Sequence, residues 1–253
     1  EDMAVQSMPD ASPAKWHLGH TSWFFEAMIL SRETGYAPVD ERYHVLFNSY
    51  YEALGDRVIR PKRGLITRPA LAEVMAYRRQ IDDRVAERLN RPMSEHEIYL
   101  FDLGLNHEQQ HQELLVQDIL HLFSCNPLVP EVWPVEPRTA PLEKAKGGQV
   151  FFQEGLTVTG ASETHRFSYD NEQPSHRVWL NAYRLDADLV SNADWIRFID
   201  AGGYEDVSLW LADGWAKRQA ENWDAPSYWR LQDGQWWQFS LCGMRPVDPD
   251  TPV

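Results

Sequence analysis

The segment from about Ser94 to Ser124 carries an unbroken helical pattern, and it is the feature that most constrains how this 253-residue chain can fold. It begins with Ser94-Glu95-His96-Glu97, the form of a capping box that satisfies backbone N–H groups at a helix N-terminus. A helix of this length gains most of its stability by burying an apolar face against neighbouring helices. The pattern therefore predicts a helical bundle.

Two histidines within this helix, His107 and His111, are four residues apart and lie on the same helix face. Imidazoles at this spacing can bind a single metal ion, which then needs a third ligand from elsewhere. The best candidate is His20, in the amphipathic, aromatic-rich run Trp16–Glu26. The sequence thus indicates a three-histidine centre between two helices, with histidines on a solvated or hydrogen-bonded face as the alternative.

The same segment, His107-Glu108-Gln109-Gln110-His111, also matches the H-E-x-x-H pattern of zinc proteases, with Glu108 as the general base. The longer metzincin pattern is not met, because Leu114 stands where it requires glycine and Gln117 where it requires histidine. A zinc protease is therefore retained as a rival hypothesis.

Composition excludes several classes of protein. The net charge of −14 argues against a nucleic-acid-binding surface, and no stretch is apolar enough to cross a membrane. The two cysteines, Cys125 and Cys242, are far apart, and Glu1-Asp2-Met3 does not resemble a signal peptide. We therefore expect a cytoplasmic protein with neither nucleic-acid nor membrane partners.

The chain changes character near residue 130. Residues 1–130 read as a four-helix bundle, with helices at about 13–34, 41–54, 69–90 and 94–124. Residues 131–148 are punctuated by proline and read as a linker. Residues 149–253 read as a loop-rich α+β domain, with strands at 150–152, 156–159, 176–180 and 183–185, a helix at 192–201, and tryptophan-rich loops after it.

Several motifs match one known family in the right order. Ser7–His20, Phe47–Glu52, Arg60–Gly64 and Asn106–Leu114 resemble the iron-dependent sulfoxide synthases of ergothioneine biosynthesis. Tyr169–Glu172, Gly202–Tyr204, Leu209–Trp215 and Gly243–Pro246 resemble the start of the formylglycine-generating-enzyme-like domain of the same family. The resemblance covers essentially the whole chain.

This resemblance implies a DinB-like four-helix bundle that carries a non-haem Fe(II) on His20, His107 and His111. The second domain would be formylglycine-generating-enzyme-like, with a C-type-lectin-like scaffold, and incomplete at its C-terminus because the family's domain continues beyond Val253. The implied reaction is the O2-dependent joining of a thiol, cysteine or gamma-glutamylcysteine, to hercynine, with oxidation of the sulfur to a sulfoxide. Three imidazoles suit iron, although zinc remains possible from the ligands alone.

Other residues of these motifs can be given roles. Gln110 and Asn48 are assigned to substrate binding; the family's match to Gln110 lies near the substrate's imidazole, and an exposed helix amide is the alternative. Tyr50 or Tyr51 would supply a proton or electron during O2 activation; adjacent helical residues point about 100° apart, so only one of them can face the iron, and Tyr51 is slightly favoured.

Four charged groups can be interpreted from their chemistry. Arg60 and Arg63 could bind a substrate carboxylate by bidentate hydrogen bonds, with a solvated basic loop as the alternative. Glu113 and Asp118 are interpreted as supporting or surface groups rather than metal ligands.

Other activities fit the same architecture. The chain could be a selenoneine synthase that takes a selenosugar, or an ovothiol-type 5-histidylcysteine sulfoxide synthase that takes unmethylated histidine. From different classes, a DinB-like bundle can be a metal-dependent thiol transferase, and a C-type-lectin-like scaffold can be a binding module.

Overall fold

The computed structural model describes residues 2–49, 56–133, 147–162 and 167–253. The chain forms two compact units, and the boundary between them does not follow the order of the sequence. The first unit comprises Glu1–Cys125 together with Ala161–Pro174, and the second comprises Asn126–Gly160 together with Ser175–Val253. A short segment of the later sequence thus belongs with the N-terminal helices.

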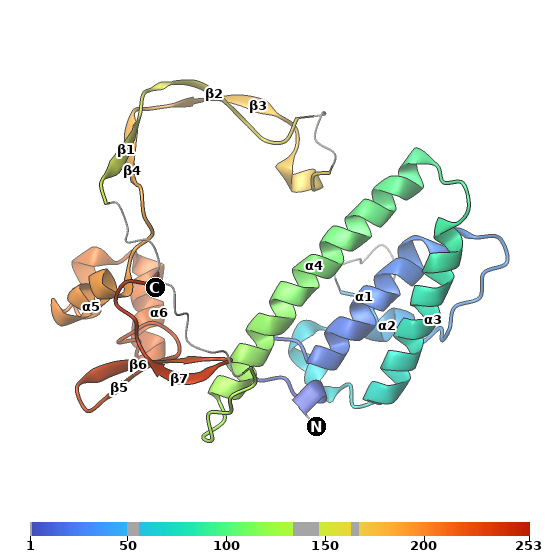
Figure 1. The fold of residues 1–253 in the computed structure, drawn as a ribbon, viewed down its shortest axis with the longest axis horizontal. Helices are drawn as coiled ribbons and strands as arrows, with labels where there is room; N and C mark the ends of the chain where they lie inside the picture. Colours follow the sequence, from blue (N-terminus) through green and yellow to red (C-terminus); the bar gives the residue numbers. More distant parts are fainter. Residues whose placement is uncertain (1, 50–55, 134–146, 163–166) are drawn as a thin grey trace. The chain divides into compact units, whose positions relative to one another are not determined.

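The first unit is built on α1 (Ala14–Met28), α2 (Tyr43–Phe47), α3 (Leu71–Leu89) and α4 (Glu95–Ser124), shown in Figure 1. Helix α1 packs against both α3 and α4. Short 3₁₀ segments at Leu30–Arg32 and Arg60–Leu65 lie in the connections, and another, Asp170–Glu172, lies in the segment that joins this unit from the later sequence. Helices therefore dominate the N-terminal part, as expected.

Two of the expected helices are shorter than the sequence pattern suggested. Helix α1 ends at Met28, and Gly35 adopts a φ of +80°, a conformation that lets the chain reverse after the 3₁₀ turn. Helix α2 ends at Phe47 because Asn48 is extended, with φ −66° and ψ 142°. Residues 50–54 of the expected second helix lie outside the described part of the chain.

The core of the first unit is aromatic and lies between α1, α2 and α3. Its fully buried side chains include Trp16, Trp23, Phe47 and Tyr77. Burying an aromatic side chain of this size stabilises a fold by about 1.5–3 kcal/mol. Because Trp16 and Trp23 flank His20 in sequence, this core also fixes the helix that carries a candidate metal ligand.

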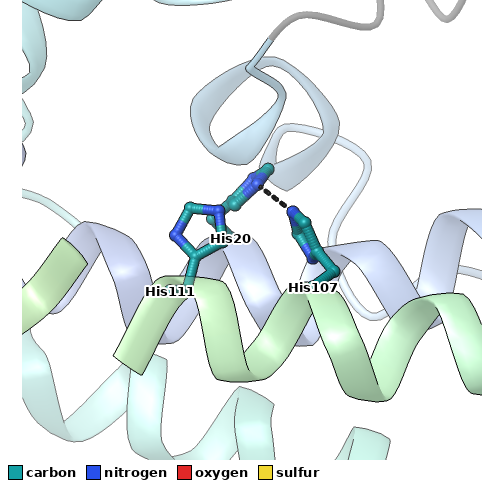
Figure 2. A group of neighbouring side chains, drawn as sticks. All are labelled: His20, His107 and His111. Carbon is teal, nitrogen blue, oxygen red and sulfur yellow. Dashed lines mark hydrogen bonds between the residues drawn. The ribbon is translucent and has the colours of Figure 1, made fainter. Parts of the chain in front are cut away.

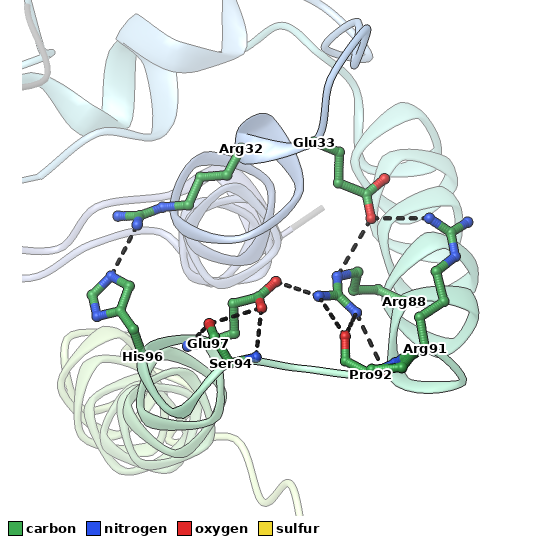
Figure 3. Close-up of polar contacts among 8 residues, drawn as sticks. All are labelled: Arg32, Glu33, Arg88, Arg91, Pro92, Ser94, His96 and Glu97. Atoms are coloured by element: carbon green, nitrogen blue, oxygen red, sulfur yellow. Dashed lines mark hydrogen bonds and ion pairs between the residues drawn. The ribbon is translucent and has the colours of Figure 1, made fainter.

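The α3–α4 connection is fastened by a buried arginine, drawn in Figure 3. Arg88 forms ion pairs with Glu33 and with Glu97, and it donates to the carbonyl of Pro92 at 3.2 Å. Glu97 also completes the capping box with Ser94, as the sequence predicted. These contacts fix the first turn of α4, and they thereby restrain the rotation of this helix about its own axis.

The second unit consists of short antiparallel strands and two helices. Strand β1 (Gln149–Phe152) pairs with β4 (Tyr183–Asp186), and β2 (Gly155–Thr159) pairs with β3 (His176–Leu180). The helices are α5 (Asn192–Asp200) and α6 (Ala212–Glu221). A three-stranded sheet follows in the order β5–β6–β7, formed by Trp229–Gln232, Gln235–Ser240 and Gly243–Pro246.

The expectation of tryptophan-rich loops after residue 201 was wrong, since α6 and this sheet occupy much of that region. Asp233 and Gly234 both have positive φ and form the two-residue turn between β5 and β6. Asp-Gly between strand-forming residues is a strong hairpin signal, and the many tryptophans masked it.

None of the helices in the described ranges is both long and apolar enough to cross a membrane. The 30-residue α4 has sufficient length, but its sequence is rich in charged and amide side chains.

Candidate metal centre

Three histidines from helices α1 and α4 point toward one another (Figure 2). His107 and His111, one turn apart on α4, have ring centroids 4.6 Å apart. His20 on α1 lies 4.9 Å from the ring of His107 and 4.5 Å from that of His111. One nitrogen from each ring lies within 4.8 Å of the other two, so a single ion can contact all three.

Hydrogen bonds select which nitrogen of His20 faces the cluster. Its Nδ1 lies 2.6 Å from the backbone carbonyl of Phe47, which can only accept, so Nδ1 carries the proton. The lone pair is then on Nε2, which lies 3.1 Å from Nε2 of His107. In the described part of the chain, Nδ1 of His107 is buried without a hydrogen-bond partner.

Burial keeps all three imidazoles neutral. Loss of solvation lowers the pKa of His107 to about 4. Burial, followed by repulsion from His107 and His17, lowers the pKa of His111 to about 3. Burial and the two neighbouring histidines hold the pKa of His20 well below its ordinary value. Since a metal binds the deprotonated ring, these side chains are ready ligands near neutral pH.

The residues present therefore fit a divalent transition metal. Three neutral imidazoles that converge from two rigid helices form a ligand set suited to non-haem iron or zinc, and they leave coordination positions open for other ligands. Trp16 stacks on His20 at 4.6 Å with an interplanar angle of 11°, and Phe24 lies 4.4 Å from the ring of His107. These aromatic contacts hold the rings in place.

The cluster opens into a cavity of about 840 Å³ within the first unit. This volume is in the range of small-molecule sites. Its walls include Arg60, Arg63 and Gln110, three of the residues that the sequence assigned to substrate binding. Asn48, the fourth, is completely buried and is not part of the cavity wall; its amide nitrogen lies 3.5 Å from the carbonyl of Asp56.

Arg63 is held firmly in the cavity wall. Its guanidinium lies 3.4 Å from the ring centroid of Trp16 and donates hydrogen bonds of 2.9 Å to the hydroxyls of Ser12 and Ser49. The side chain is only 2% exposed. Arg60 is exposed in part and donates to the carbonyl of Asp10 at 3.3 Å. Arg63 is thus a pre-oriented cation beside the histidines.

The two candidate tyrosines, Tyr50 and Tyr51, lie outside the described residues. Two other tyrosines, Tyr99 on α4 and Tyr169, line the cavity. Tyr169 comes with Asp170 and Asn171 from the segment 161–174, which joins the first unit. These lining positions were not predicted, although Tyr169–Glu172 was one of the motifs that carried the family resemblance.

Glu108 does not occupy the position that a zinc protease would require. Its carboxylate pairs with Arg78 on α3 at 2.8 Å, and it is absent from the cavity wall. A general base must reach the metal-bound water, so this geometry argues against the protease hypothesis. Asp118 and Glu113 do line the cavity, in keeping with supporting roles.

Comparison with known proteins gives independent information. The family profile of the sulfatase-modifying factor enzyme 1-like domain matches residues 136–253. Three curated relatives, all called hercynine oxygenase, match nearly the whole chain. The protein of Mycolicibacterium thermoresistibile is 29% identical over 100% of this chain and 54% of its own length. That of Mycolicibacterium smegmatis is 30% identical over 98% and 56%, and that of Mycobacterium tuberculosis 28% over 90% and 52%.

The chain thus spans about half the length of these relatives. The matches confirm the resemblance to the sulfoxide synthase family of ergothioneine biosynthesis. The structure and the domain match together confirm the coarse architecture, with helices in the N-terminal part and a sheet-rich domain in the C-terminal part.

Proposed function

We propose that this relative of the hercynine oxygenases is a non-haem iron enzyme that uses O2 to join hercynine to a thiol, with oxidation of the sulfur to a sulfoxide. The observation that carries the proposal is the cluster of His20, His107 and His111 in the wall of a cavity that also holds a buried arginine. The names of the relatives point to hercynine as the substrate. An iron ion bound to the three imidazoles would supply the activation of O2.

The protein's own residues would bind and orient the two organic substrates. Gln110 follows His107 by three residues on α4 and lines the cavity, where its amide can hydrogen-bond to the imidazole of hercynine. Arg63 offers a planar fork of N–H donors that matches a carboxylate. Its stacking on Trp16 fixes the plane of this fork before a donor arrives, which reduces the entropy lost on binding.

Arg60 and Arg63 favour a donor that carries a carboxylate. Cysteine and gamma-glutamylcysteine both do, whereas a selenosugar presents hydroxyl groups that gain less from a guanidinium. We therefore favour the thiol donors over the selenosugar. As the sequence suggested, we also propose that Tyr51 or Tyr50 supplies a proton or an electron during the activation of O2.

The test is turnover with a panel of donors. Protein loaded anaerobically with Fe(II) is mixed with hercynine and either cysteine, gamma-glutamylcysteine or a selenosugar, then exposed to O2, and the products are identified by mass spectrometry. We expect a coupled sulfoxide from a carboxylate-bearing thiol, dependent on O2 and absent in His107→Ala. Coupling with the selenosugar alone would overturn the choice of donor. A protein that binds iron and hercynine but couples none of the donors would overturn the proposed function.

A further inference from the structure

A fourth histidine, His17, lines the same cavity and contacts one member of the cluster. His17 lies on α1, one turn before His20, and it is 3% exposed. It is not one of the three proposed metal ligands. Its Nδ1 lies 2.9 Å from Nδ1 of His111, and its Nε2 lies 2.9 Å from Oδ2 of Asp118. One side chain thus bridges a candidate metal ligand and a carboxylate on the same helix, α4.

The proton positions along this bridge follow from the chemistry of its ends. An ionised carboxylate only accepts, and Oδ2 of Asp118 also accepts from the backbone N–H of Ser12 at 2.8 Å. Nε2 of His17 must therefore donate to it. In a neutral imidazole the other nitrogen is then an acceptor, so Nδ1 of His17 accepts from Nδ1–H of His111. This leaves the lone pair of His111 on Nε2, free for a metal.

We propose that His17 is a positioning residue for the metal centre, and that Asp118 anchors it. The hydrogen-bonded series Asp118–His17–His111 would select one tautomer of His111, fix the rotation of its ring and increase its strength as a ligand, as a carboxylate paired directly with a ligating histidine does. This inference rests on the proposed metal centre. It does not depend on which reaction the metal supports.

Asp118 is also connected, through Ser12, to the arginine proposed to bind the donor. Ser12, whose N–H binds Asp118, accepts a 2.9 Å hydrogen bond on its hydroxyl from Arg63. The arginine proposed to bind the donor and the histidine proposed to bind the metal are thus joined by a continuous series of short hydrogen bonds. Such a series restrains Asp118 from two sides and keeps its carboxylate directed at His17.

The first measurement is the tautomer of His111, read from the ¹⁵N resonances of labelled histidine in the metal-free protein and in its Zn(II) form. The signal of His111 is assigned by its loss in His111→Gln. We expect the proton on Nδ1 in the wild type in both forms. A proton on Nε2 would overturn the proposal. Because neither state requires turnover, this result is independent of whether the enzyme couples hercynine to a thiol.

The second measurement is the affinity for Zn(II), determined by competition with a chelator. His17→Phe keeps a ring but removes the acceptor, and should weaken binding on the order of tenfold or more. His17→Asn places a carbonyl acceptor near the position of Nδ1, and should restore both affinity and tautomer toward the wild type. Equal losses in the two folded variants, or no loss in His17→Phe, would show that His17 only fills space.

If His17→Phe does not fold, Asp118→Asn tests whether the series Asp118–His17–His111 positions the metal ligand. The amide oxygen can still accept from His17, but the negative charge is gone, so we expect weaker Zn(II) binding and shifted ¹⁵N resonances of His17 and His111. Asp102→Asn on the same helix is the matched control, since Asp102 lies outside the cavity wall, and it should change neither. An Asp118→Asn protein indistinguishable from this control would overturn the proposal.

Discussion

Replacing Gly19 with alanine should disturb the metal centre through the core, because this glycine touches the residue that holds His20. A Cβ at position 19 would lie 2.2 Å from Cε1 of Phe47 and 2.5 Å from two further atoms of the ring. Carbon atoms in contact are normally about 3.5–4.0 Å apart, so the ring would have to move by more than about 1 Å. Phe47 is fully buried and packs on Tyr43 and Tyr77, which leaves it little space to do so.

The expected free-energy change is the difference of two effects. Overpacking a core costs typically about 1–3 kcal/mol, and the clash here places the cost toward the upper end. Alanine is better than glycine inside a helix by about 1 kcal/mol, which offsets part of it. We therefore expect a net loss of about 1–2 kcal/mol in the free energy of unfolding, equivalent to a drop in Tm of roughly 5 °C for a protein of this size.

The loss should extend to metal binding, because the carbonyl of Phe47 accepts the hydrogen bond that orients His20. Thermal denaturation followed by circular dichroism gives the stability, and metal analysis gives the occupancy. Gly214→Ala in α6 is the matched control: its Cβ would meet only Trp210, at an ordinary 3.5 Å, so it should be neutral or stabilising. Wild-type stability and full metal occupancy in Gly19→Ala would refute this account of the packing around His20.

Three further predictions concern charge. Arg63→Lys keeps the charge but loses the planar fork of N–H donors, so the KM for a carboxylate-bearing thiol should rise and its kcat/KM should fall by roughly tenfold to a hundredfold. The KM for hercynine should be nearly unchanged. Equal effects on both substrates would contradict the assignment of Arg63 to the thiol donor. The metal-free protein should lose stability as the pH falls from about 6.5 towards 4, because the unfolded chain protonates its histidines near pH 6.5 whereas burial lowers the pKa of His107 to about 4. Urea denaturation at several pH values should show the free energy of unfolding falling by roughly 1.4 kcal/mol per pH unit for each such histidine. A free energy of unfolding that does not change over this pH range would contradict the prediction. Glu108→Gln should leave metal binding and coupling intact. It should lower the free energy of unfolding by at most about 1 kcal/mol, because the partly exposed carboxylate of Glu108 pairs with Arg78. Loss of activity in a folded, metal-loaded variant would instead indicate that Glu108 acts as a base.

The sequence was most informative where a local pattern has a direct structural meaning. The capping box at Ser94 and the spacing of His107 and His111 predicted both the start of α4 and the face on which the two rings meet. His20 was chosen as their partner from the aromatic run around it, and the family resemblance implies the same residue. The structure brings its ring to the same cluster.

What could not be predicted depends on contacts distant in sequence. Nothing near Asp118 indicates that its carboxylate meets His17, which is 101 residues earlier in the chain. The segment that contributes Tyr169 to the cavity belongs by sequence to the later domain and by packing to the first unit. The hairpin at Asp233-Gly234, by contrast, had a local signal that the tryptophan-rich composition obscured.

The most direct test of the central claim is the iron content of the purified chain after anaerobic loading with Fe(II), compared with that of His20→Ala, His107→Ala and His111→Ala. The matched control is His96→Ala, an exposed histidine on α4 outside the cavity wall. We predict one iron per chain in the wild type and the control, and a sharp loss in each of the three variants, because two imidazoles alone make a poor iron site. Full retention of iron in folded His107→Ala would contradict the assignment of this cluster as the metal centre.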